Sequence, residues 1–178
     1  MEILCPQMRR LAVFFLSIAA LVVPAAASAA HLAAGDGTLV VKNGSAPTGV
    51  PVVKLTIKSG SVIGQVGPGG ARIIIDAGAK GATDLAVTGA GAPQANAKSD
   101  TAREWSSNDP FKFRAVNGHF TIVIYGSGVS LFAVGNGLAI LQGQPDTPKG
   151  DGRYSLNGND FLSLPGSPTK QLVFGDDS

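Results

Sequence analysis

Apolar and polar residues alternate with a two-residue period through the chain after residue 30, and this alternation restricts the fold more than any other feature. Three runs show it, with apolar faces made of Val53, Leu55 and Ile57; Phe111, Phe113 and Ala115; and Phe120, Ile122 and Ile124. Successive side chains of a β-strand point to opposite faces, so these runs predict strands that are buried on one side. The wholly apolar runs 73–75 and 138–141 predict strands covered on both sides. No comparable run shows a helical period, and we expect an all-β protein.

Glycine and asparagine separate these runs. Asn-Gly pairs at 43–44, 117–118 and 157–158 predict hairpin turns, because both residue types tolerate the positive φ that such turns require. Other glycines are expected to end the remaining strands: Gly60, Gly67, Gly69, Gly126, Gly128, Gly135 and Gly137. The spacing favours about ten short strands in a single antiparallel β-sandwich or barrel.

Two glycine-rich segments of the chain are near-copies of one another. SGSVIGQVGPGGA occupies residues 59–71, and SGVSLFAVGNGLA occupies residues 127–139. The matched positions keep one even spacing, so each matched side chain would keep its face of a sheet. The match predicts two pseudo-symmetric halves, about 36–88 and 111–164, joined by an irregular loop over 89–110. A chance likeness between glycine-rich strands is the alternative.

The first thirty residues have the three parts of a secretory signal peptide. Two arginines precede the apolar run 11–23, and an Ala-Ser-Ala sequence follows at 27–29. The run is too short for a transmembrane helix, which needs about 20 apolar residues. We expect a signal peptide over 1–29 with cleavage near Ala29, and a single all-β domain over 30–178. The protein would then be secreted, periplasmic or bound to the cell envelope, with no membrane span after cleavage.

Cysteine usage and charge exclude some classes of protein. Cys5 is the only cysteine and precedes the apolar run, so the processed domain has none, whether the chain starts at Met1 or Met8. An exported domain without a disulfide depends on its core for stability. The whole chain has a formal net charge of +2 and no run of basic residues after the signal peptide. This charge pattern argues against a nucleic-acid partner.

Residues with catalytic or metal-binding chemistry are sparse. His119 is the one histidine beyond the mature N-terminus, and no Gly-x-Ser-x-Gly motif presents a nucleophile. With no cysteine and one usable histidine, the sequence predicts no zinc site, and no cofactor-binding motif is present. The best oxygen ligands for calcium would be Asp151, Asn157, Asn159 and Asp160, but turn formation explains these residues equally well. The sequence predicts no catalytic, cofactor or metal site.

Three residues are weak candidates for binding. Trp105 is the only tryptophan, in a predicted edge strand over 101–105, and it could stack on a ligand or anchor the core. His119 and Tyr125 share the polar face of their predicted strand. A solvated histidine on a sheet surface is the alternative for His119.

The second half of the chain resembles a group of exported actinobacterial all-β proteins. The similar residues are Val134-Gly135-Asn136-Gly137, Tyr154-Ser155-Leu156-Asn157-Gly158 and Ser163-Leu164-Pro165. The resemblance implies a single exported domain and no particular activity.

These features favour a non-catalytic β-sandwich module of the cell envelope or extracellular space, with a binding or structural role. Its partner would be cell-wall polysaccharide or an envelope protein. The alternative is a hydrolase of envelope polysaccharide that uses a pair of carboxylates brought together by the fold. A third possibility is a chaperone or inhibitor that pairs through an uncovered sheet edge near Trp105.

Overall fold

Three long strands form the centre of the molecule: β2 (Val53–Val66), β7 (Phe111–Tyr125) and β8 (Val129–Leu141). In the computed structural model, β2 lies between β7 and β8 and pairs antiparallel with both along nearly its whole length. The structure describes residues 36–78, 82–89, 94–144, 152–166 and 169–175, which belong to one compact unit. The predicted signal peptide, 1–29, lies outside these residues and stays a prediction.

Shorter strands extend the sheet from either end of the three central ones. β1 (Gly37–Gly44) pairs with the first half of β8, β9 (Arg153–Leu156) pairs with β1, and β10 (Leu162–Ser163) pairs with β9. β4 (Ala82–Thr88) pairs with the first half of β7. β11 (Lys170–Phe174) pairs with the second half of β8. β3 (Ala71–Asp76) pairs with the second half of β7, β6 (Ala102–Ser107) pairs with β3, and β5 (Asn96–Ala97) pairs with β6. The described residues thus form one antiparallel sheet of eleven strands, without helices and without closure into a barrel. They contain no apolar helix of membrane-spanning length.

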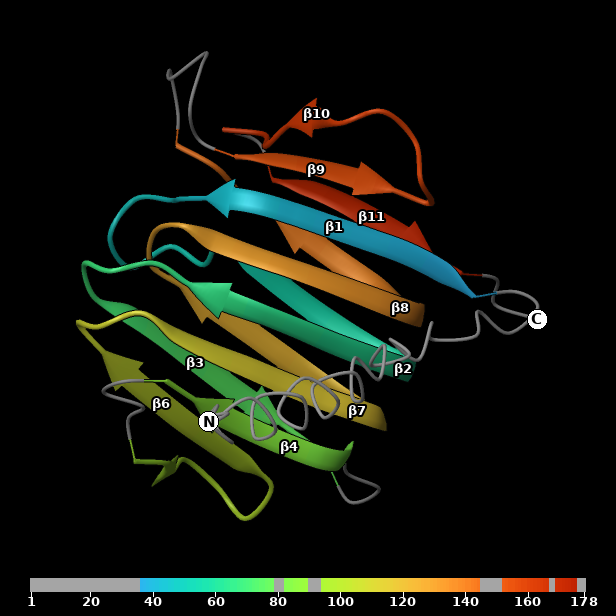
Figure 1. Cartoon of the computed structure of the whole chain (residues 1–178). Helices are drawn as coiled ribbons and strands as arrows, with labels where there is room; N and C mark the ends of the chain where they lie inside the picture. Colours follow the sequence, from blue (N-terminus) through green and yellow to red (C-terminus); the bar gives the residue numbers. More distant parts are fainter. Residues whose placement is uncertain (1–35, 79–81, 90–93, 145–151, 167–168, 176–178) are drawn as a thin grey trace, which may run out of the picture. The chain divides into compact units, whose positions relative to one another are not determined.

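The sheet folds over itself into two layers that share the three central strands. The first layer contains β10, β9, β1, the first half of β8, the second half of β2, the first half of β7, and β4. The second layer contains β11, the other halves of the three central strands, β3, β6 and β5. Figure 1 views the outer face of the first layer, and β2, β7 and β8 can be followed from this layer into the one behind.

Glycines lie side by side where the central strands pass between the layers. Gly60 of β2 is opposite Gly118 of β7 and Gly135 of β8, and the register of β2 shifts on both sides of this position. A Cβ atom built on Gly135 would lie only 2.6 Å from the Cα of Gly60. Side chains would therefore prevent the close backbone approach, and glycine together with β-bulges permits the bend.

One extra residue at the bend keeps the core face of β7 pointing inward. The buried residues before the bend are Phe111, Phe113 and Ala115, and those after it are Phe120, Ile122 and Ile124. The alternation changes phase at Asn117, which has a φ of +51°. The asparagines of the other two Asn-Gly pairs, Asn43 and Asn157, have similar φ values of +52° and +53°. The apolar faces predicted from the sequence are confirmed, and both layers contribute them to one hydrophobic core.

The predicted hairpin turns are wrong at two of the three Asn-Gly pairs. Asn43 and Asn117 have the expected positive φ but lie inside β1 and β7, next to shifts in register. At Asn117 the chain continues in the same strand instead of reversing. At Asn43 the strand ends at Gly44 without a hairpin, because the next strand, β2, does not pair with β1. Asn157 does lie in a turn after β9, where the Asn159 N–H donates to the carbonyl oxygen of Leu156. The prediction that glycines end the strands is likewise wrong for Gly60, Gly135 and Gly137, which lie inside β2 and β8.

The two near-copies of sequence are neighbours in the sheet. Gly60 faces Gly135, and at the far end of the pair the Gly67 N–H donates to the Ser127 carbonyl oxygen. Gly60 is therefore next to Gly135, and Gly67 is next to Gly128, so the same spacing between two glycines in each copy is explained by their pairing. The Gly-x-Gly sequences are not equivalent, because 67–69 connects β2 to β3 whereas 135–137 lies inside β8. The two halves are therefore not equivalent at their Gly-x-Gly sequences, contrary to the prediction. That the halves arose by duplication stays a prediction.

The segment 89–110 is more ordered than the predicted irregular loop. It contains β6 and the two-residue strand β5. The short strand predicted over 101–105 is confirmed as β6. Its second edge pairs with β5 only at Arg103 and Glu104, so pairing of a partner strand along the edge near Trp105 stays a prediction.

Candidate functional site

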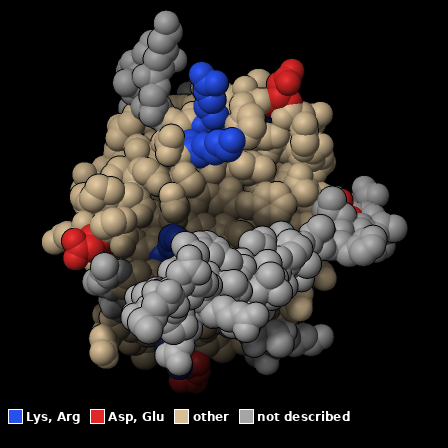
Figure 2. Space-filling view, viewed as in Figure 1, with Lys and Arg blue, Asp and Glu red and all other residues tan. Residues whose placement is uncertain are grey.

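The outer face of the first layer is hollowed into a groove of about 730 Å³. Side chains from β1, β8, β2, β7 and β4 line it. Figure 2 shows this side of the molecule, and the described residues visible in it are mostly uncharged, with a few Lys or Arg and Asp or Glu side chains. We call this feature the groove throughout.

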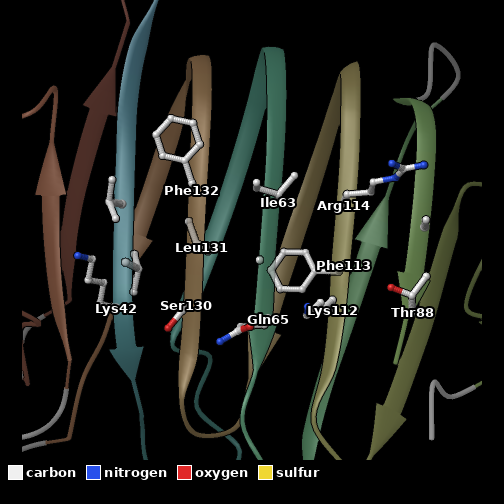
Figure 3. A pocket seen from close by; sticks show the side chains of 14 residues that line it. Lys42, Ile63, Gln65, Thr88, Lys112, Phe113, Arg114, Ser130, Leu131 and Phe132 are labelled. Atoms are coloured by element: carbon white, nitrogen blue, oxygen red, sulfur yellow. The ribbon is translucent and has the colours of Figure 1, made fainter. Parts of the chain in front are cut away.

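An apolar row crosses the groove from strand to strand. Val40 of β1 is opposite Phe132 of β8, Phe132 is opposite Ile63 of β2, and Ile63 is opposite Arg114 of β7. The side chains of Ile63 and Phe132 are 53% and 39% exposed. They lie side by side at the centre of the face (Figure 3). Large apolar side chains grouped on an exposed sheet face indicate a binding surface more strongly than scattered ones.

A polar row runs parallel to the apolar one. Gln65 of β2 is opposite Ser130 of β8 on one side and Lys112 of β7 on the other, and Thr88 of β4 is the next neighbour of Lys112. Lys42 lies at the β1 end of this row (Figure 3). The Ser130 hydroxyl oxygen already accepts a hydrogen bond from the Asn43 N–H at 3.0 Å. The groove therefore combines an aliphatic and aromatic strip with a neighbouring strip of donors.

The floor of the groove depends on a glycine. Gly64 lies opposite Phe113, and a Cβ atom on Gly64 would collide with the Phe113 ring. The ring thus takes the space that a side chain at position 64 would fill.

The charged side chains among the described lining residues of the groove are cations. They are Lys42, Lys112 and Arg114, and no described carboxylate lines it. The Lys42 ammonium group lies 4.5 Å from the centroid of the Phe161 ring, in a cation–π contact. A second hollow of about 690 Å³ shares Gln65 and Lys112 with the groove and includes one carboxylate, Asp109.

None of the three weak binding candidates lines the groove. Trp105 is 8% exposed and packs in the core opposite Ile73, so it acts as a core anchor and is not free to stack on a ligand. The Tyr125 ring lies 4.0 Å from the Arg72 guanidinium on the second layer. His119 is exposed next to the glycine bend. Ile63 and Phe132 were not predicted as binding residues from the sequence, because their apolar side chains occupy outward positions.

The described residues provide no catalytic constellation at the groove. The carboxylate pair that a polysaccharide hydrolase would need is missing from its lining. No group of three metal-binding side chains occurs in the described part of the chain. Of the calcium candidates, Asp151 lies outside the described residues, and the side chain of Asn157 accepts a hydrogen bond from the Thr38 N–H.

Two carboxyl groups away from the groove have lowered pKa values. The hydrogen bond from Lys98 lowers the pKa of Glu104, with 2.8 Å between Lys98 Nζ and Glu104 Oε2. The hydrogen bond from the Thr101 side chain, followed by that from the Gly78 N–H, lowers the pKa of Asp76. Both groups stabilise the connections around β5 and β6 and are not arranged for proton transfer.

Glu104→Gln is expected to reduce the pH dependence of stability. Because folding lowers the pKa of Glu104 from its usual 4.5, the ionised form stabilises the fold above that pH. This stabilisation is lost as the pH falls through the lowered pKa. Urea unfolding at pH 7 should show a loss of at most about 1 kcal/mol in the variant, since the pair is near the surface. The difference from the wild type should disappear near pH 2, and a difference that persists there would contradict this account.

Comparisons with protein-family models, with curated proteins and with solved structures gave no significant match. The groove is therefore the feature from which a function can be inferred.

Proposed function

We propose that this protein is an exported, non-catalytic β-sandwich module that acts in the cell envelope or outside the cell by binding a ligand in the groove. The observation that carries the proposal is the pair Ile63 and Phe132, two large apolar side chains exposed at the centre of a concave sheet face. Leaving such a group in water costs free energy that binding recovers. The size of the groove is in the range of small-molecule sites.

A binding role fits the groove better than the hydrolytic alternative. Hydrolysis of a glycosidic bond needs two carboxyl groups on either side of the bond. The described lining residues of the groove include cations and apolar groups and no carboxylate pair. Together with the predicted signal peptide, this lining supports an exported module that captures or presents its ligand.

Ile63→Asp and Phe132→Asp are expected to abolish capture of envelope material by the protein. Each substitution places a charge in the apolar row, while the exposed position keeps the effect on folding small. Immobilised protein would be incubated with fractionated cell envelopes, and the retained polysaccharide, lipid and protein would be measured.

Val173→Asp is the matched control for this experiment. Val173 is 54% exposed, close to the 53% of Ile63, but it lies on β11 of the second layer. The control should retain its ligand, and all variants should keep the melting temperature of the wild type. Unchanged capture by both groove variants would contradict the proposed function.

A further inference from the structure

β11 is the outermost strand of the second layer, and one of its two edges is paired within the described part of the chain. All five residues Lys170–Phe174 pair with β8 without a shift in register. No strand among the described residues pairs with the other edge. The backbone N–H and C=O groups on that edge can bond to water or to a further strand. The edge is therefore a template for strand addition.

β11 lacks the features that usually prevent strand addition. It has no proline, no β-bulge and a single charged residue, Lys170. The Lys170 ammonium group donates a hydrogen bond to the Tyr154 hydroxyl group at 2.8 Å, so it is held against β9. The other strands at the ends of the sheet differ, because β10 and β5 have two residues each and β4 has Asp84 within it. β11 is thus the edge best suited to a partner.

The first layer extends further than the second on this side of the molecule. Outside β8, the first layer contains β1, β9 and β10, whereas β11 is the one described strand there in the second layer. β9 contacts β11 through Tyr154 and Lys170, and β10 is one strand further out. In Figure 1, β11 is seen behind β9 and β1, and β10 lies beyond them. A strand added to β11 would therefore lie beneath β10.

Leu162 of β10 faces this position. It is opposite Tyr154, so the two side chains lie on the same face of the first layer, and Tyr154 faces β11. Tyr154 is 3% exposed, whereas Leu162 is 52% exposed, because β11 is the last described strand beneath them. The inward side chains of an added strand would cover Leu162, and burial of this apolar surface would stabilise the complex.

The layer formed by β9 and β10 obstructs a second copy of this chain. Two copies that joined β11 to β11 antiparallel, around a two-fold axis, would have both first layers on the same side of the joined strands. Each β10 would then need the space above the β11 of the other copy, where β9 of that copy already lies. An extended segment without a second layer of its own meets no such obstacle.

We propose that the free edge of β11 is a second binding site, separate from the groove, and that its ligand is an extended segment of another polypeptide. The segment adds to the second layer as a strand, with its backbone paired to β11. Apolar side chains at alternate positions of the segment face inward and pack on Leu162. The backbone hydrogen bonds require a polypeptide, and the alternate apolar positions give it sequence preference.

Hydrogen exchange of the purified protein tests the inference, with a short peptide of alternating valine and threonine and a lysine at each end as the probe. Amides of β11 that face the free edge should exchange at least about tenfold more slowly with the peptide present. The amides of β4 should not change. The same peptide with methylated backbone nitrogens keeps its side chains but lacks N–H donors, and it should not slow exchange in β11.

Leu162→Asp should weaken binding of the same peptide about tenfold, because it places a charge against the inward face of the added strand. Fluorescence anisotropy of the labelled peptide measures the affinity. Phe161→Asp is the matched control and should change nothing, because Phe161 is 40% exposed but its ring contacts Lys42, away from the added strand. Both variants should keep the melting temperature of the wild type.

Several outcomes would overturn the inference. Unchanged exchange in β11, or peptide binding that protects β4 instead, would remove the site, and equal binding of the methylated peptide would remove the backbone pairing. Equal affinities of the two aspartate variants would contradict packing beneath β10. Slower exchange in β11 that needs no peptide and increases with protein concentration would assign the edge to a second copy. None of these results involves the groove, so the proposed function is tested separately.

Discussion

Gly135→Ala is expected to destabilise the protein by about 4 kcal/mol or more, a large part of the stability of a typical domain. The new Cβ would collide with the Ser59 carbonyl oxygen and would lie 2.6 Å from the Cα of Gly60. The backbone φ of +126° at Gly135 is also unfavourable for alanine. Both effects act where β2 and β8 pass between the layers, so relief of the collision requires the two strands to separate. Urea unfolding, followed by the fluorescence of Trp105, measures the loss.

Gly158→Ala separates the collision from the backbone preference. Gly158 has a φ of +75°, but no atom lies within 4 Å of a Cβ built there. The control should cost only about 1–2 kcal/mol, the usual penalty for a left-handed conformation. Equal losses in the two variants would show that the close approach of the backbones at Gly60 and Gly135 contributes nothing.

Phe120→Ala is expected to cost about 3–5 kcal/mol. Phe120 is 1% exposed and is the first buried residue of β7 after the bend. Its removal leaves a cavity between the layers that the shared central strands cannot close by moving independently. Phe161→Ala is the control, because Phe161 is 40% exposed and its loss should cost less than about 1 kcal/mol. Similar losses for both variants in urea unfolding would argue against a common core at the bend.

The sequence predicted the buried faces but not the path of the chain. Alternation assigned Phe113 and Ile122 to the core correctly, since a period of two is a local property of a strand. The local pattern could not predict that the backbone continues in the same strand at Asn117 instead of forming a hairpin. Positive φ at asparagine suits a hairpin and a β-bulge equally, and the difference is made by β2, which pairs with β7 on both sides of this residue.

The groove was hidden in the sequence for a related reason. Ile74 and Phe132 both occur in runs that are apolar on two faces. In the structure Ile74 is partly covered, whereas Phe132 remains 39% exposed. Tertiary packing, and not the local sequence pattern, decides whether an outward-facing apolar side chain is covered by another part of the chain. The two alternatives for Trp105 could not be separated for a similar reason, because no sequence signal distinguishes a core anchor from a surface ring.

The shared central strands also affect the order in which the chain can fold. β2 has β7 and β8 as its two neighbours, and both are more than forty residues further along the chain. In a polypeptide that emerges amino terminus first, one hydrogen-bonding edge of β2 therefore stays unpaired until β7 is complete at residue 125, and the other until β8 is complete at residue 141. Native pairing at the middle of the sheet has to wait for most of the polypeptide, and during that interval the unpaired edges of β2 are exposed to incorrect pairing.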